Sequence, residues 1–480
     1  MIRRLATLGA LVALAAACGE AQHSATSTST SNNVLLSPTG PSRTLVGKRH
    51  KARPAILQVT LVNGDTRRRV WGGRVRIAGM TAKTNRRGVA RIRVADRHPY
   101  PVHVKVRGFS TRIVRESFRR RRKVTIRVYR PELQWPFYGA TAARSQAQRH
   151  IRLRPPFRIV WSRGIGTLIE FPAVVSDGVA YIGNFRGTVR AISMRSGHVA
   201  WRTDLHAKMA ASPGVVGDEL VVHTMSGYVH VLDRATGRRL WSRYVGSPIE
   251  SSPVVWHGVD YFGAWNGRVY ALDLRRHRLR WTYRSGYKIT SSPALAGRTL
   301  FVGDYGGRLL ALRARDGALR WARSVNGRIY GTPAVAGRRV FVPSSTGGSL
   351  TAFSTGGRRL WALHTGSYVY SSPAAWRGRV FFGAYNGSFY GVSASSGRIL
   401  WRVRTGGPVS GAAVVVDGIA YAGSFSHRIF GVDAGSGRVR LRFPHGEYVP
   451  VSGNGGRLLL HGYSRLYAVE PRRRRRHHKR

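Results

Sequence analysis

The sequence contains one cysteine, Cys18, among 480 residues. A single thiol cannot form an intramolecular disulfide, so the folded parts must be held by their hydrophobic cores alone. Acidic side chains are also scarce, with 20 Asp and Glu against 80 Lys and Arg. Such an excess of positive charge attracts nucleic acid, anionic lipid or acidic cell-wall polymer. The arginines are spread along the whole chain. This favours arginine as a common surface residue of the protein over one dedicated polyanion-binding stripe.

The apolar run at residues 5–17 is too short to span a bilayer as a permanent helix, which takes about 20 residues. It follows two arginines and ends in small residues at Cys18. This arrangement is typical of a secretory signal peptide, so residues 1–18 are predicted to direct export. The end of the run resembles a bacterial lipoprotein signal, which implies a lipidated Cys18 and a membrane-anchored protein at the cell surface or in the periplasm. Secretion without a lipid, after cleavage at Ala17, is the alternative.

Residues 19–53 are rich in Ser and Thr and are predicted to form a disordered tether, because they cannot bury enough apolar surface to fold. Residues 54–130 alternate apolar and polar side chains, with glycine turns about every 8–12 residues, which predicts a small β-sandwich. The segments 57–62, 73–77, 89–94 and 102–106 carry its resemblance to carboxypeptidase-regulatory-like, transthyretin-like modules. Such modules act as spacers or adhesive units. Residues 131–156 are predicted to be a connector, and residues 472–480 a basic tail.

A repeat with a period of 40 residues dominates the rest of the chain. Its clearest column is seven tryptophans in register: Trp161, Trp201, Trp241, Trp281, Trp321, Trp361 and Trp401. A second column places Ser or Thr before proline, for example Ser252-Pro253 and Thr332-Pro333. Each period holds four short β-like segments separated by Gly, Asn and Ser turns, and units of this kind are propeller blades.

The ends of the repeat predict how the ring closes. Residues 157–162 supply a Trp-bearing last strand, whereas residues 458–470 supply earlier strands and no tryptophan. Together they complete one blade, so the sequence predicts an all-β fold in which residues 157–471 form an eight-bladed β-propeller. The tryptophans are predicted to pack between neighbouring blades, each ring burying roughly 150–250 Å².

Within one period, the segments Ser226-Gly227, Val231-Leu232-Asp233, Thr236-Gly237 and Leu240-Trp241 resemble the pyrroloquinoline-quinone-type (quinoprotein-like) propeller repeat. The resemblance covers about two-thirds of the chain. It implies one of two functions, because that repeat family includes quinone-dependent dehydrogenases and also a propeller lipoprotein of outer-membrane assembly that binds partner proteins without a cofactor.

A dehydrogenase of that kind would need a calcium site with about six to eight oxygen ligands and a carboxylate as general base. Glu170 and Glu250 are the only acids in the column predicted to begin the innermost strands near a central channel. They are a candidate channel site. The favoured alternative is that each pairs with a nearby arginine or a backbone donor. Many of those enzymes carry adjacent cysteines, which this chain lacks, so we expect no catalytic residue, metal or cofactor. Pyrroloquinoline quinone (PQQ) and calcium belong only to the alternative of a PQQ-dependent alcohol or sugar oxidoreductase.

Aromatic side chains at the turns between second and third strands, with Tyr and Arg from the adjoining loops, predict a binding face. Its predicted members are Phe185, Trp265, Tyr305, Tyr385, Phe425, Tyr287, Tyr368, Arg284 and Arg328. Tyr, Trp and Arg dominate binding hot spots; the alternative is that each ring only packs on the neighbouring blade. The sequence therefore predicts a non-catalytic scaffold that binds a protein or an anionic envelope polymer. Nucleic acid is not an expected partner of an exported protein.

Overall fold

The computed structural model describes residues 55–94, 100–116 and 123–472. Cys18, the predicted signal peptide, the predicted tether and the basic tail beyond residue 472 lie outside these residues. The described chain is all-β, apart from one short 3₁₀ turn, Pro131–Leu133. No helix in these ranges is long and apolar enough to cross a membrane. An all-β fold was predicted and is confirmed.

The N-terminal module, residues 55–129, contains two sheets that share one core. The first has the order β4-β1-β7: β4 (Val89–Val94), β1 (Ala55–Asn63) and β7 (Lys123–Val128). The second has the order β3-β2-β5-β6: β3 (Met80–Lys83), β2 (Arg74–Ile77), β5 (Tyr100–Lys105) and β6 (Arg112–Glu116). Burial alternates along β2, β4 and β7, so every second side chain faces the core. The family of this module stays a prediction.

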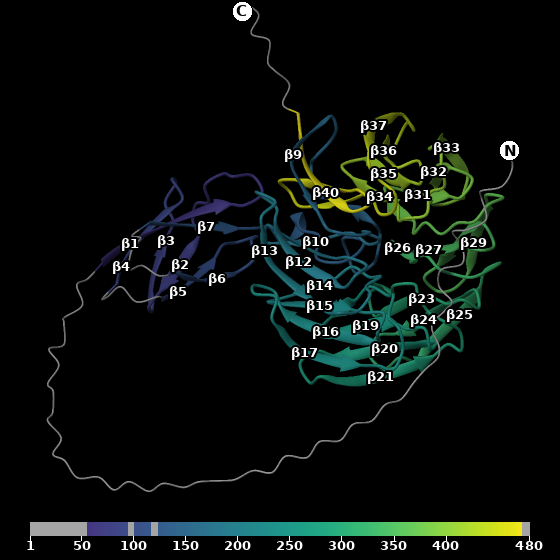
Figure 1. The fold of residues 1–480 in the computed structure, drawn as a ribbon, viewed down its shortest axis with the longest axis horizontal. Coiled ribbons are helices and arrows are strands. Elements are labelled where there is room, and N and C mark those ends of the chain that lie inside the picture. The colour runs from purple at the N-terminus through teal and green to yellow at the C-terminus, as the bar shows by residue number, and fades with distance from the viewer. Residues whose placement is uncertain (1–54, 95–99, 117–122, 473–480) are drawn as a thin grey trace, which may run out of the picture. The chain divides into compact units, whose positions relative to one another are not determined.

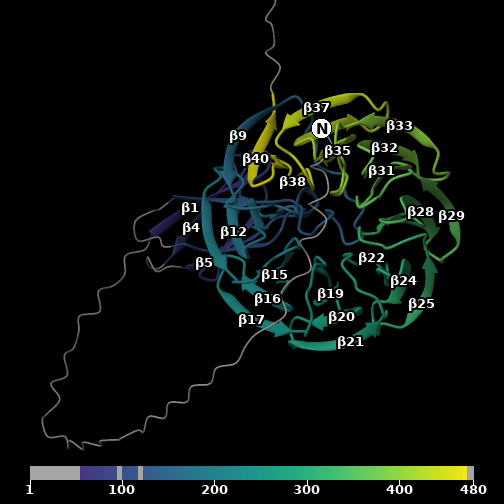
Figure 2. The same ribbon diagram turned by 45° about the vertical axis from the view of Figure 1, so that its right-hand side comes forward.

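Residues 157–471 form eight sheets in the described chain, arranged around a common axis in Figure 2. Six have consecutive strands: β10–β13 (Val174–Ser176, Val179–Gly183, Thr188–Ser193, Val199–Asp204), β14–β17 (Gly214–Val216, Glu219–His223, Tyr228–Asp233, Arg239–Tyr244), β18–β21 (Val254–Trp256, Val259–Gly263, Arg268–Asp273, Arg278–Arg284), β22–β25 (Ala294–Ala296, Thr299–Gly303, Arg308–Arg313, Leu319–Ser324), β26–β29 (Ala334–Ala336, Arg339–Ser344, Ser349–Ser354, Arg359–His364) and β30–β33 (Ala374–Trp376, Arg379–Ala384, Ser388–Ser393, Ile399–Arg404). The seventh adds β8 (Ala147–Gln148) to β34–β37 (Val414–Val416, Ile419–Ser424, Arg428–Asp433, Val439–Pro444). This is a β-propeller.

The eighth sheet joins the two ends of the repeat. β9 (Phe157–Gly164) pairs antiparallel with β40 (Arg465–Pro471), beside β39 (Leu458–His461) and β38 (Val451–Gly453). In Figure 1 the first strand of the propeller, β9, lies against the last, β40. The composite sheet predicted from the incomplete ends of the repeat is therefore present.

The tryptophan column links each sheet to the next. In six of the seven cases the indole N–H donates to a backbone carbonyl 33 or 34 residues further along the chain, at 3.0–3.2 Å. A glycine of the neighbouring sheet lies on the ring: a Cβ at Gly317 would come within 2.6 Å of Trp281. The exception is Trp241, which stacks on His277 at 4.4 Å. The predicted packing between neighbouring sheets is confirmed.

The Ser/Thr-Pro column forms a second link, close to the axis. The N–H of Ser212 donates to Oγ of Ser252 at 3.0 Å, and Ser252 donates in turn to Ser292 at 2.9 Å. Ser292 continues to Oγ1 of Thr332 at 3.2 Å, and Thr332 to Oγ of Ser372 at 2.9 Å. Since each hydroxyl receives the N–H of the residue 40 positions earlier, the ladder fixes the spacing of five consecutive sheets.

The connector has a structural role that the sequence did not predict. Between Trp135 and Gln146 its carbonyl groups accept N–H bonds at 2.7–3.0 Å from the central residues of six innermost strands: β10, β14, β22, β26, β30 and β34. Arg144 is fully buried, and its guanidinium donates to the carbonyls of Tyr138, Pro293, Ser252 and Pro253. The connector therefore ties the innermost strands together.

Two residues that depart from the repeat pattern, His223 and Asp260, form a hydrogen bond with each other. His223 lies where five of the other sheets have glycine (for example Gly263), and Asp260 lies where the others have Ala, Val or Leu (for example Leu300). Both side chains are fully buried, with His223 Nε2 2.8 Å from Asp260 Oδ2 and Nδ1 2.6 Å from the Ser251 carbonyl oxygen. Each polar side chain thus offsets part of the cost of burying the other, and Asp260 Oδ1 stays without a partner.

We predict that replacing either partner by the repeat residue destabilises the protein more than replacing both. His223→Gly or Asp260→Leu alone should lower the free energy of unfolding by roughly 3–5 kcal/mol, because a polar group stays buried without its partner. The double variant should recover a large part of that loss. Urea unfolding of all four proteins measures the coupling; additive single effects would contradict it.

Candidate functional site

The turns between second and third strands are fastened to the loops that precede each sheet. The backbone N–H of each turn-tip residue donates to the carbonyl of the residue 17 positions earlier, at 2.7–3.3 Å. The donor–acceptor pairs are Phe185–Leu168, Met225–Lys208, Trp265–Pro248, Tyr305–Lys288, Ser345–Arg328, Tyr385–Tyr368 and Phe425–Pro408. These bonds hold turns and loops at the same end of the strands, as the sequence predicted.

At this end, aromatic rings of neighbouring sheets form a continuous surface that we call the aromatic arc. Its members are Tyr305, Tyr330, Tyr368, Tyr370, Tyr385, Phe425 and Tyr448. Neighbouring ring centroids along the arc lie 5.0–6.1 Å apart, mostly in edge-to-face or tilted contact. Such pairs contribute about 0.5–1.5 kcal/mol each beyond their area burial. The rings thus pack on their neighbours and also present a shared surface, with Tyr368 51% and Tyr330 38% exposed.

Four predicted face residues belong to the arc: Tyr305, Tyr368, Tyr385 and Phe425. Tyr330 and Tyr370 were not predicted to join them, because the sequence places both in the inner column with Glu170 and Glu250. The signal was available in that column, where two aromatic residues stand among small and acidic ones.

Cationic side chains extend the arc toward earlier sheets. Lys288 Nζ lies 3.1 Å from the ring centroid of Trp265 and 5.2 Å from that of Tyr305. The Arg328 guanidinium lies 5.8 Å from the Tyr305 ring. These cation–π contacts place the predicted residues Trp265 and Arg328 beside the arc.

The remaining predicted residues lie apart from the arc. Phe185 contacts Lys208 at 5.6 Å, and Tyr287, 53% exposed, contacts Arg308 at 5.1 Å. Arg284 ends β21 as an exposed side chain, and it contacts no ring of the arc within the described ranges. The predicted residues therefore cluster in one half of the ring and are dispersed in the other, and their role in binding stays a prediction.

Glu170 and Glu250 are partly buried beside Tyr330. Burial, reinforced by the charge of Glu250, raises the pKa of Glu170 to about 7. Burial also raises the pKa of Glu250, against the opposing charge of Lys288. Neither carboxylate forms an ion pair with an arginine or accepts a backbone N–H in the part of the chain that is described, and Glu250 Oε2 is buried without a hydrogen-bond partner. The expected pairing is not seen.

The same side chains decide how well a calcium ion would fit. Calcium takes about six to eight oxygen ligands, several of them ionised carboxylates. Two carboxyl groups beside tyrosines supply too few oxygen ligands for it. Within the described residues no group of three or more His, Cys, Asp or Glu is placed to hold a metal ion. The site does not fit calcium, and we derive no quinone chemistry from it.

The fold and this surface define a class of protein, a β-propeller of PQQ-type repeats with an aromatic surface at one end of its strands. A family model described as outer membrane protein assembly factor BamB matches residues 158–282, 185–328 and 265–473. Since these matches cover more than half of the 480 residues, the chain belongs to that family.

Solved structures share the fold at low sequence identity. BamB from Moraxella catarrhalis is 19% identical, with a TM-score of 0.57 over 65% of this chain and 99% of that chain. The computationally designed protein Ika8 is 16% identical, with a TM-score of 0.58 over 65% and 98% of the two chains. Quinohemoprotein alcohol dehydrogenase from Comamonas testosteroni is 14% identical, with a TM-score of 0.61 over 71% and 81%. No curated protein sequence matched. These likenesses establish the propeller fold alone.

We predict that Glu170 makes stability fall as pH rises from about 4.5 to 7. Its folded pKa of about 7 exceeds its ordinary value of 4.5, so in this window the folded state holds a proton that the unfolded state releases. Glu170→Gln should therefore match the wild type below pH 4 and exceed its free energy of unfolding by about 1–3 kcal/mol at pH 8. Denaturant unfolding across pH measures the difference. Glu132→Gln, at an exposed position, is the control; a parallel pH profile for Glu170→Gln and the wild type would contradict the assignment.

Proposed function

We propose that this protein is a non-catalytic propeller scaffold that binds a partner protein through the aromatic arc. The observation that supports this most is the continuity of the arc: seven rings from five neighbouring sheets form one partly exposed surface. Rigid tyrosines bury a large area at low entropic cost and dominate binding hot spots. An anionic envelope polymer remains the second kind of partner, favoured by Lys288 and Arg328 at the edge of the arc.

The buried surroundings of two tyrosine hydroxyls support a binding role over acid–base chemistry. Burial raises the pKa values of Tyr305 and Tyr330 above the usual tyrosine range, so both hydroxyls stay neutral and can donate hydrogen bonds. The nearby Glu170 and Glu250 can accept hydrogen bonds from a partner, because the chain leaves them without arginine partners. A partner segment with apolar and donor side chains would complement this surface.

We propose that each of the eight sheets is one blade, that the N-terminal module is a carboxypeptidase-regulatory-like sandwich, and that the chain is exported and anchored through lipid on Cys18. The signal-like residues 1–18 support export. The family description, which names an outer membrane assembly factor, supports a place in the cell envelope.

We predict that Tyr305→Ala, Tyr368→Ala and Tyr385→Ala together reduce partner recovery about tenfold or more, since each ring is a candidate hot spot. The measurement is quantitative mass spectrometry of proteins crosslinked to the full-length tagged chain on intact cells. The control variant changes Trp71, Ile113 and Ile159 to Ala, three apolar side chains that are 53–69% exposed outside the arc. Equal recovery by the arc variant and the wild type would contradict the proposal.

The dehydrogenase-like fold supports one alternative, a PQQ-dependent alcohol or sugar oxidoreductase. We expect purified full-length protein supplied with PQQ and calcium to show no substrate-dependent dye reduction, because the donor set at Glu170 and Glu250 does not fit calcium. Turnover that is lost in Glu170→Gln and Glu250→Gln would favour the enzyme instead.

A further inference from the structure

A cavity of about 900 Å³ lies at the other end of the strands, between the propeller and the N-terminal module. Three propeller turns line it: residues 177–178 between β10 and β11, 193–195 between β12 and β13, and 454–457 between β38 and β39. The module contributes residues 62–67 and side chains of β6 and β7. The turns of the aromatic arc join second to third strands, so the cavity and the arc are separate sites.

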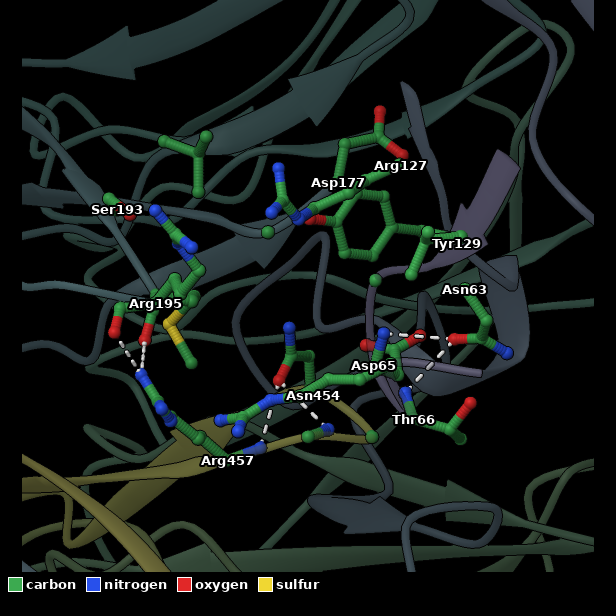
Figure 3. Close-up of a pocket in the computed structure, with 18 of the residues that line it drawn as sticks. Asn63, Asp65, Thr66, Arg127, Tyr129, Asp177, Ser193, Arg195, Asn454 and Arg457 are labelled. Atoms are coloured by element: carbon green, nitrogen blue, oxygen red, sulfur yellow. Dashed lines mark hydrogen bonds between the residues drawn. The ribbon is translucent and has the colours of Figure 1, made fainter. Parts of the chain in front are cut away.

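Close packing and ion pairs fix the walls of the cavity. Tyr129 lies against Gly64 and Gly178, where an added Cβ would come within 2.1 Å of its ring or hydroxyl. Arg112 pairs with Asp177 at 3.3 Å, joining the module to the propeller. Arg457 is buried and donates to the carbonyls of Met194 and Arg195. The residues around the cavity are thus held in place from both sides (Figure 3).

Several polar atoms in these walls lack partners. Asp65 is 7% exposed and its Oδ1 has no hydrogen-bond partner, and Asp177 Oδ1 is also buried without one. The Nε atom of Arg112 is also buried without a hydrogen-bond partner. Buried polar groups in folded proteins are nearly always hydrogen-bonded, so these atoms indicate capacity for a ligand. Burial raises the pKa of Asp65 to about 7, with further increases from the charges of Asp177 and Glu132.

The charge around the cavity favours an acidic ligand. Five arginines line it against three carboxylates, and Arg127 and Arg195 have no carboxylate partner in the described part of the chain. Both of these arginines are exposed, so an incoming anion can reach them. An amine would meet this positive excess and is disfavoured.

We propose that this cavity binds an acidic sugar, a hydroxyl-rich ring carrying a carboxylate or a phosphate. Sugar hydroxyls would donate to the carboxylates of Asp65 and Asp177, which line the cavity, and the acidic group would pair with Arg127 and Arg195. Val179 and Val114 offer apolar contact for the face of the ring. The volume lies in the range of small-ligand sites, about 300–1,000 Å³. This site is independent of the partner-binding function of the arc.

Calorimetric titration of the full-length chain tests the proposal. Glucuronate and glucose 6-phosphate should bind saturably, and glucose and inorganic phosphate should bind roughly tenfold more weakly or worse, because each lacks one of the two contacts. A glucuronate hexamer distinguishes the source: tighter binding than the monomer indicates an envelope polymer, and equal or weaker binding indicates a free sugar.

Variants separate the site from general charge. Asp65→Asn and Arg195→Gln should each weaken glucuronate binding about tenfold, whereas Arg320→Gln, an exposed arginine on β25, should leave it unchanged. The triple variant of the arc should also bind glucuronate normally, so failure of one site does not decide the other. Absence of saturable binding, binding of phosphate as tight as that of the sugars, or equal loss in Arg320→Gln would overturn the proposal.

Discussion

The pairing of β9 with β40 is the contact on which the whole propeller depends, because a ring of sheets holds together only when its first and last strands meet. Glu470 on β40 reinforces it. Its carboxylate pairs with Arg158 of β9 at 2.8 Å, with Arg457 of the β38–β39 turn at 2.7 Å and with Arg67 of the N-terminal module at 3.1 Å. Basic residues outnumber acidic ones fourfold in this chain. The single carboxylate of Glu470 thus joins the first strand of the propeller, the last sheet and the N-terminal module.

The closed ring allows the serine ladder, the connector and the turn-tip hydrogen bonds to act together. Because the ring cannot spread, the serine ladder and the connector hold the innermost strands at fixed spacing. The hydrogen bonds from the turn tips to the preceding loops then hold the turns that contain Tyr305, Tyr385 and Phe425 in fixed positions relative to the sheets. A surface made of loop side chains is therefore fastened to the sheets beneath it by backbone hydrogen bonds, and such preorganisation would lower the entropic cost of the proposed binding.

The sequence predicted the contacts that recur from period to period and missed the contacts that occur only once. The tryptophan column and the joined ends could be predicted because six of the seven tryptophans make the same contact with a glycine of the next sheet, as Trp281 and Gly317 show. The role of Arg144 could not, since its four carbonyl partners come from separate parts of the chain. For the same reason Tyr330 and Tyr370 were assigned to a different column from the rings they touch, and the expected arginine partners of Glu170 and Glu250 are absent from the described structure.

Departures from the repeat carry the information about function. If symmetry alone governed the aromatic end, each sheet would present the same side chain, yet Ser345 stands between Tyr305 and Tyr385 in the turn column. Tyr330 and Tyr370 from the inner column bridge that gap, with centroids 5.5 Å apart. The arc is therefore continuous over one half of the ring although its members come from two columns. An off-axis surface of this kind suits an asymmetric partner lying across several sheets better than a small ligand centred on the axis.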